Sequence, residues 1–172
     1  MSDAPTASVT REDGRQVLLR PHGCFACGEL NEHGLHLQLH VGHARCTTEF
    51  TLDERFQGWD GIAHGGIVST ILDEVGAWAL LDQDSWGLTA RLTIDFRRPV
   101  PIGRPLQAEG EIVERRRRVT RTRARLVDAG SGEVLARAEA TYVDAPHETR
   151  TRLRERYELR LDARPAEAEA PS

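Results

Sequence analysis

Two adjacent glycines followed by a long apolar segment that contains two acids constrain this chain more than any other feature. Residues 63–75 read AHGGIVSTILDEV. Apolar residues recur at helical spacing from residue 67 to residue 80 and cover most of the circumference, so the sequence predicts a buried helix over residues 65–81. A carboxylate inside such a helix is costly unless neighbouring groups hold it or the chemistry uses it.

The start of this helix can bind and polarise a ligand. Gly65 and Gly66 let a ligand approach the backbone where free N–H groups and the positive end of the helix dipole gather. Asp73, desolvated within the helix, is a candidate base. The alternative interpretation is a plain tight entry to a buried helix, with Asp73 hydrogen-bonded for structural reasons or facing solvent.

Helix geometry limits how these groups can cooperate. The eight residues from Gly65 to Asp73 rise by about 12 Å along an α-helix. Reacting atoms have to lie roughly 3 Å apart. If both residues are catalytic, we therefore expect Asp73 to come from a second subunit whose helix packs antiparallel about a two-fold axis.

Alternating apolar and polar residues predict strands on both sides of the helix. Turns are expected at residues 42–43 and 129–132, an irregular loop at 53–63, and a break at the proline-rich segment 99–103. A single apolar helix with consecutive antiparallel strands predicts an α+β fold, a curved antiparallel sheet wrapped around one central helix. The expected strands are residues 35–41, 45–52, 88–96, 106–119, 120–128 and 134–143.

The chain divides into one domain and two polar ends. Residues 1–20 are expected to form a loose N-terminal tail, and residues 21–145 the folded domain. Residues 146–172 form a polar C-terminal extension, with a short helix predicted over residues 150–161 and a disordered Ala/Glu/Pro tail from residue 165.

Composition excludes several classes of partner. The 172 residues carry a net charge of −4, which does not favour bulk nucleic-acid binding. No apolar stretch approaches the roughly 18 residues of a membrane span, and the N-terminus lacks a signal-peptide core. With an odd number of cysteines, three, the sequence predicts a cytoplasmic protein without disulfides.

Several short motifs occur together between residues 22 and 143. They are CFACG at 24–28, Asn31, GL at 34–35, QGWDGIAHGG at 57–66, LDE at 72–74 and RPVPIG at 98–103. In these motifs the chain resembles the hotdog-fold acyl-CoA thioesterases of the phenylacetate-pathway (PaaI-type) branch. The resemblance implies a hotdog fold and hydrolysis of an acyl-CoA thioester by a homodimer or homotetramer, with no metal and no cofactor.

The resemblance also implies roles for individual residues. Gly65 would donate its backbone N–H to the thioester carbonyl, with His64 beside it, and Asp73 would be the base or nucleophile. Thr89 falls where the family often has a Ser or Thr that positions water. Some relatives carry Asn or Gln six residues before the His, where this chain has Gly58. The residues expected to bind substrate are Gly66, Gln57, Asp60, Arg97 and Arg98.

Two alternatives concern acids and cysteines. Glu74 could replace Asp73 as the base, but adjacent helix positions point about 100° apart, and Glu74 is expected to pair with an Arg. Cys24 and Cys27 could bind zinc, with other ligands drawn from His22, His33, His36 and Cys46. Structural zinc usually needs a second paired motif, so we expect a packed loop without metal.

Arginines on alternate positions form a basic face on one predicted strand. The favoured interpretation is a solvated edge balanced by nearby glutamates; the alternative is a site for the CoA phosphates that includes Arg97 and Arg98. The arginines are 115–118, 121, 123 and 125, and the glutamates are 109, 111 and 114.

Fold alone does not fix function, so rival functions remain open. One rival is a non-catalytic acyl-CoA-binding or sensing protein on the same fold. The other is a hotdog enoyl-CoA hydratase, which would need an Asp/His pair at one double bond. The acyl group is not specified, although Phe56, Trp59, Trp78 and Trp86 could shape its pocket.

Overall fold

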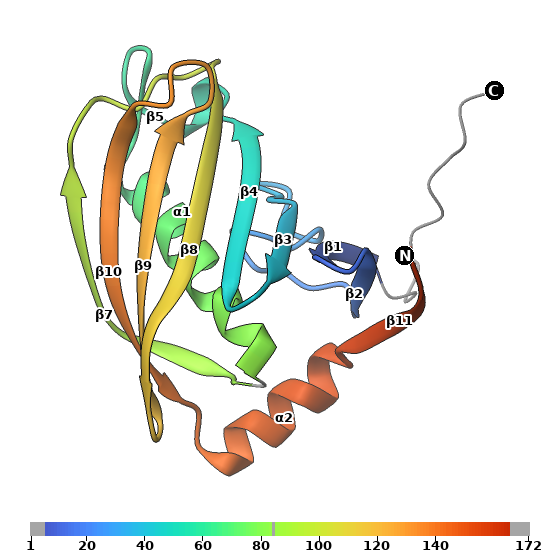
Figure 1. Cartoon of the computed structure of the whole chain (residues 1–172). Helices are drawn as coiled ribbons and strands as arrows, with labels where there is room; N and C mark the ends of the chain where they lie inside the picture. Colours follow the sequence, from blue (N-terminus) through green and yellow to red (C-terminus); the bar gives the residue numbers. More distant parts are fainter. Residues whose placement is uncertain (1–5, 84, 166–172) are drawn as a thin grey trace.

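The computed structural model describes residues 6–83 and 85–165, in which a curved, mostly antiparallel sheet wraps around α1 (Gly65–Trp78) (Figure 1). The α+β prediction is confirmed. Within these residues nine strands pair in the order β11-β2-β1-β3-β4-β8-β9-β10-β7. The strands are β1 Thr6–Arg11, β2 Arg15–Leu19, β3 Leu39–Gly42, β4 Arg45–Thr51, β7 Gly87–Phe96, β8 Pro105–Arg116, β9 Val119–Asp128, β10 Val134–Asp144 and β11 Arg160–Pro165.

The N-terminal segment differs from the sequence prediction. Instead of a loose tail, β1 and β2 form a hairpin, and β1 continues the sheet by pairing parallel to β3. Their pattern was too weak to recognise, because between residues 9 and 19, where burial is described, only Val9, Val17 and Leu19 are buried. The strand predicted over residues 35–41 begins only at Leu39, while backbone hydrogen bonds to residues 25 and 26 hold Leu35 and Leu37 in a loop.

Helix α1 packs into the concave face of the sheet. Val68, Ile71, Leu72 and Val75 are fully or almost fully buried. The helix approaches the sheet closely at Gly110 of β8, where a Cβ atom would lie 2.5 Å from the carbonyl oxygen of Val75. The absence of that side chain lets the helix backbone rest directly on the strand.

One stripe of α1 is not covered by the sheet. Ser69, Thr70 and Asp73 keep partial exposure, and Gly65 and Gly66 are exposed. The sequence predicted a helix buried almost all round, and within this single chain that prediction is wrong. The uncovered stripe lies beside the edge strand β7.

The ends of the helical segments also shift. The α-helix ends at Trp78 and continues as the 3-10 turn η2 (Ala79–Gln83). The second helix, α2 (His147–Tyr157), begins before the predicted residue 150 and leads into β11, which pairs with β2. Figure 1 shows α2 outside the curved sheet. Most of the predicted disordered tail, residues 166–172, lies outside the described residues.

Candidate active site

The first turn of α1 leaves one backbone N–H free. His64 is the N-cap, and its Nδ1 accepts the Gly66 N–H at 2.9 Å. Nδ1 is therefore already used as an acceptor within the helix cap. Among the described residues, no acceptor takes the Gly65 N–H. A donor at a helix N-terminus with no partner can stabilise negative charge on a ligand oxygen.

Asp73 is held by two hydroxyl groups from two different strands. Thr89 Oγ1 on β7 donates to Asp73 and lies 3.0 Å from Oδ1 and 3.2 Å from Oδ2. Tyr142 Oη on β10 lies 3.0 Å from Oδ1 and 2.9 Å from the Asp73 carbonyl oxygen. The pKa of the Tyr142 phenol is raised, mainly by burial and secondly by the negative charge of Asp73. The phenol therefore keeps its proton and acts as a donor.

A β-bulge aims Thr89 at Asp73. Arg91 pairs with Thr141 and Thr89 pairs with Tyr142, so Ala90 is an extra residue on β7. Because side chains alternate across a strand, the extra residue moves Thr89 to the concave face, the face of Tyr142. Simple alternation from Leu92 would have placed Thr89 on the convex face.

Tyr142 was not recognised from the sequence. It was counted only as part of the strand predicted over residues 134–143. A signal was present, because β10 otherwise presents small inward residues, Ala136, Ala138 and Ala140, and Tyr142 is the large exception. The opposite helix residue is Gly76, where a Cβ would lie 2.6 Å from the Tyr142 hydroxyl.

The neighbouring acid, Glu74, faces a different environment. Trp78 Nε1 donates to Glu74 Oε1 at 2.9 Å, and Cys24 Sγ lies 3.9 Å from the same oxygen. The predicted ion pair with an Arg is absent from the contacts of Glu74 in the described chain. The pKa of the Glu74 carboxyl is raised to about 7, mainly by burial and secondly by electrostatic repulsion from Cys24.

The expected loop before α1 contains the hairpin of β5 (Gln57–Trp59) and β6 (Ile62–Ala63), preceded by the 3-10 turn η1 (Glu54–Phe56). Gln57 accepts the Gly61 N–H at 3.3 Å, so its amide stabilises its own turn. Asp60 is exposed in that turn. A Cβ at Gly58 would lie 3.2 Å from His64 Cα, so this position brings the hairpin close to the helix start.

A depression of about 340 Å³ lies over the start of α1, between the helix and the end of β7. Gly65, Phe96, Arg97 and Arg98 are among its lining residues. Arg97 pairs with Asp95 at 3.5 Å and Arg98 with Glu133 at 3.0 Å, both at exposed positions. The structure thus brings two predicted substrate-binding arginines to the same depression as Gly65.

Of the aromatic residues considered for an acyl pocket, three are already used elsewhere. Phe56 is buried in the core, Trp78 holds Glu74, and Trp86 stacks on Tyr157 of α2 at 6.1 Å. Trp59, at 81% exposure, remains available to a ligand.

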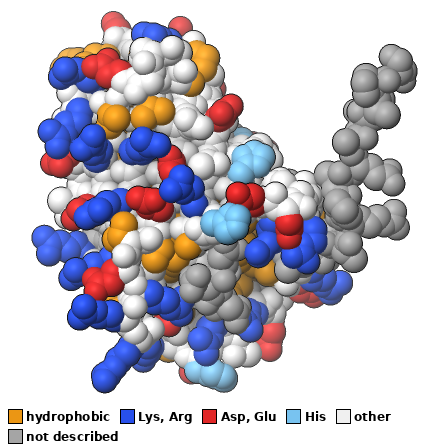
Figure 2. Space-filling model, viewed as in Figure 1, with side chains coloured by type: hydrophobic (Ala, Val, Ile, Leu, Met, Phe, Trp, Pro, Cys, Tyr) orange, Lys and Arg blue, Asp and Glu red, His pale blue; other side chains and the backbone are white. Residues whose placement is uncertain are grey.

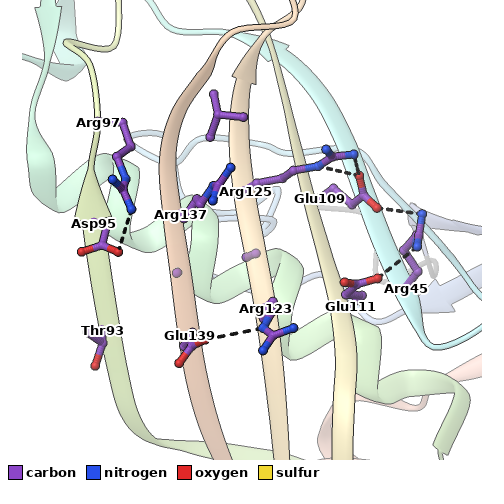
Figure 3. Close-up of a pocket in the computed structure, with 13 residues that line it drawn as sticks. Arg45, Thr93, Asp95, Arg97, Glu109, Glu111, Arg123, Arg125, Arg137 and Glu139 are labelled. Atoms are coloured by element: carbon purple, nitrogen blue, oxygen red, sulfur yellow. Dashed lines mark hydrogen bonds and ion pairs between the residues drawn. The ribbon is translucent and has the colours of Figure 1, made fainter.

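The basic face is a set of paired charges. Figure 2 shows arginines interspersed with acids over the outer face of the sheet. A groove of about 670 Å³ crosses this face, and Figure 3 shows its charged side chains projecting from neighbouring strands. Arg125 pairs with Glu109 at 2.7 Å, and Arg123 with Glu139 at 3.5 Å. These pairs fit the solvated-edge interpretation, and they lie on the opposite side of the sheet from Asp73.

Gly65 and Asp73 do not meet within one chain. Both lie on the uninterrupted helix α1, so the axial separation of about 12 Å applies. Each has its own neighbour on β7: Thr89 touches Asp73, and a Cβ on Gly65 would lie 3.6 Å from the Phe96 ring. The two groups therefore lie near opposite ends of the edge strand.

Comparison with known proteins identifies the family. The model of the thioesterase superfamily matches residues 60–135. The "Putative esterase SSO1253" of Saccharolobus solfataricus is 31% identical over 108 residues, which cover 62% of this chain and 69% of that protein. The chain belongs to the thioesterase superfamily. The matched region includes α1 with Asp73 and β7 with Thr89. It ends at the start of β10, before Tyr142.

Solved structures confirm the hotdog fold. The thioesterase superfamily protein RHA08564 is 26% identical with a TM-score of 0.67, over 76% of this chain and 66% of that one. A Streptococcus pneumoniae thioesterase protein crystallised with coenzyme A is 18% identical with a TM-score of 0.56, over 59% of this chain and 78% of that one. Within the described residues, no helix is long and apolar enough to cross a membrane.

Proposed function

We propose that this protein is a PaaI-type acyl-CoA thioesterase, which hydrolyses a CoA thioester to a free acid and CoA. The observation that carries the proposal is Asp73, a carboxylate fixed by Thr89 and Tyr142 at the uncovered side of the central helix. Membership of the thioesterase superfamily supports the reaction class, and the coenzyme A in the pneumococcal relative supports the leaving group.

In the proposed mechanism Asp73 removes a proton from a water molecule that attacks the thioester carbon. The carbonyl oxygen becomes negatively charged, and the Gly65 N–H of the other subunit donates to it. The tetrahedral intermediate then collapses, the C–S bond breaks, and the CoA thiolate leaves and takes up a proton. Direct attack by the Asp73 carboxylate, followed by hydrolysis of the anhydride, is the nucleophilic alternative.

Strand β7 is the proposed dimer edge. It is ten residues long, its outer edge is unpaired in the described chain, and Leu88 and Phe96 are half exposed on it. Antiparallel pairing with a second β7 would place the Thr89 end of one strand beside the Phe96 end of the other. Asp73 of one chain would thereby approach Gly65 of its partner.

The groups around Gly65 suggest how the substrate binds. Arg97 and Arg98 would contact the CoA phosphates, because guanidinium groups bind phosphate oxygens bidentately. Trp59 would contact the acyl or pantetheine portion. Gly66 lies in the first turn of α1, and Gln57 and Asp60 lie in the hairpin that precedes it. All three would shape the entrance to the substrate site.

Assaying a panel of acyl-CoA esters tests this function. Free CoA should be separated chromatographically, because the partly exposed Cys24 would itself react with a thiol reagent. We expect multiple turnovers with at least one ester class and a large loss in Asp73→Asn. Saturable binding of acyl-CoA by calorimetry without turnover would instead support the non-catalytic binding protein.

A further inference from the structure

A second polar cluster lies on the other side of α1 from Asp73. The sulfur atoms of Cys24 and Cys27 and a carboxylate oxygen of Glu74 all lie within 4.8 Å of one another. Cys27 is buried, and Cys24 and Glu74 are partly buried. The proposed hydrolysis uses none of these three groups.

The loop is shaped to present both sulfur atoms on one side. The Gly28 N–H donates to the Cys24 carbonyl oxygen at 2.9 Å, closing a tight turn. A Cβ at Gly28 would lie 2.3 Å from the Cys24 backbone nitrogen, so only glycine fits this position.

Glu74 is oriented for ligation by a second contact. Trp78 Nε1 donates to Glu74 Oε1 at 2.9 Å, which fixes the carboxylate and leaves further lone pairs available. Hydrogen bonds of this kind orient ligands around a metal ion. Glu74 lies 50 positions from Cys24 in sequence, and packing of the loop against the helix brings it to the two cysteines.

The spacing of the three atoms suits one small cation. Cys24 Sγ lies 3.9 Å from Glu74 Oε1, and no pair in the cluster exceeds 4.8 Å. Zinc bonds are about 2.3 Å to sulfur and 2.0–2.2 Å to oxygen, so a tetrahedral site holds its ligand atoms about 3.6–3.8 Å apart. The distance between Cys24 and Glu74 is already close to this value, and no pair in the cluster has to contract by more than about 1.2 Å.

We propose that Cys24, Cys27 and Glu74 bind one Zn²⁺ per chain, with water as the fourth ligand on the partly exposed side of Cys24. Two thiolates favour zinc over magnesium or calcium. The ion would tie the loop at residues 22–30 to helix α1, one residue from Asp73. The sequence predicted no metal because it offered only one ligand pair, and the third ligand lies on a helix remote in sequence.

Metal titration of the reduced, metal-free full-length protein tests this proposal. We expect uptake of one equivalent of Zn²⁺ by calorimetry, and Co²⁺ should give thiolate charge-transfer absorption. Cys24→Ser, Cys27→Ser and Glu74→Gln should each weaken binding by at least about 10-fold, a conservative figure for ligand loss. Cys46→Ala is the matched control, because it removes a buried cysteine outside the cluster and should bind normally.

Two outcomes would overturn the metal site. One is no stoichiometric uptake by folded, reduced wild-type protein, which would leave a hydrogen-bonded cluster. The other is an equal loss of affinity in Cys46→Ala, which would point to non-specific thiol binding. Because the readout needs no thioester, it remains decisive whether or not the protein proves to be a hydrolase.

Discussion

At the scale of single residues, two adjacent acids on one helix meet different surroundings. Asp73 points toward Thr89 and Tyr142 at the open side of the helix, whereas Glu74 points toward Trp78 and Cys24 under the loop. The turn of about 100° between neighbouring helix positions produces this division. Only Asp73 is positioned to reach a substrate at the proposed dimer interface.

Replacing each acid by its amide tests this division. Asp73→Asn keeps the size of the side chain and removes the base, so kcat should fall about 10²–10⁴-fold with little change in KM. Glu74→Gln should have a far smaller effect on kcat. Steady-state kinetics on one acyl-CoA would contradict the assignment if Asp73→Asn were fully active, or if Glu74→Gln were equally impaired.

Tyr142 is predicted to position Asp73 rather than to touch the substrate. A hydrogen bond to a charged group is worth about 1.5–3 kcal/mol, so Tyr142→Phe should lower kcat roughly 10–100-fold. The ring remains, and the fold should survive.

Thr89→Val provides the matched comparison, since it removes the second hydroxyl from Asp73 while keeping a branched side chain. We expect both variants to retain KM within a few-fold. Full activity in Tyr142→Phe, with a native circular dichroism spectrum, would show that this hydroxyl has only a structural role.

At the scale of elements, the fit of α1 against β8 depends on the missing side chain at Gly110. A Cβ there would lie 2.5 Å from the carbonyl oxygen of Val75, and both partners are rigid backbone. Overpacking of this kind typically costs about 1–3 kcal/mol, so Gly110→Ala should lower the free energy of unfolding by that amount.

Gly23→Ala is the control, because a Cβ at Gly23 would meet no atom within 4 Å. Denaturant unfolding followed by circular dichroism measures both variants. Equal stability of Gly110→Ala and the wild type would mean that the helix does not approach the strand as closely as described.

The elements also show what a sequence can and cannot predict. The helical period of residues 67–80 and the alternation in β7 to β10 predicted the central helix and most of the sheet, because burial on one face dictates those patterns. The bulge at Ala90 has no such signature, yet it decides that Thr89 faces Asp73. The hairpin of β1 and β2 was missed because few of the residues between 9 and 19 are buried.

Long-range packing sets the remaining limits of prediction. His64, Gly65 and Asp73 were proposed from a motif and spacing within one short segment, which can be read directly from a sequence. The partners of Asp73 and Glu74, namely Tyr142 and Cys24, come from segments 69 and 50 residues away. A sequence alone does not reveal which strand faces which helix side.

At the scale of the whole molecule, one chain carries two proposed half-sites, Gly65 and Asp73, rather than one complete site. The Gly65 N–H and Asp73 lie about 12 Å apart along α1. Phe96 of β7 lies beside Gly65, and Thr89 of β7 donates to Asp73. A two-fold axis near the middle of β7 would bring each half-site to its complement. Hydrolysis should therefore require the dimer.

Mixing two inactive variants tests this central claim most directly. Asp73→Asn removes the base, and Gly65→Pro removes the donor N–H at the first helical position, where proline is well tolerated. Each parent should be poorly active. In a fully exchanged equal mixture half of the dimers are mixed, and each mixed dimer has one intact site of two.

We therefore predict that the mixture recovers about a quarter of wild-type activity. Subunit exchange should be verified independently, for example by native mass spectrometry of differently tagged chains. Activity that stays at the mean of the two parents, with mixed dimers present, would contradict an active site shared between subunits.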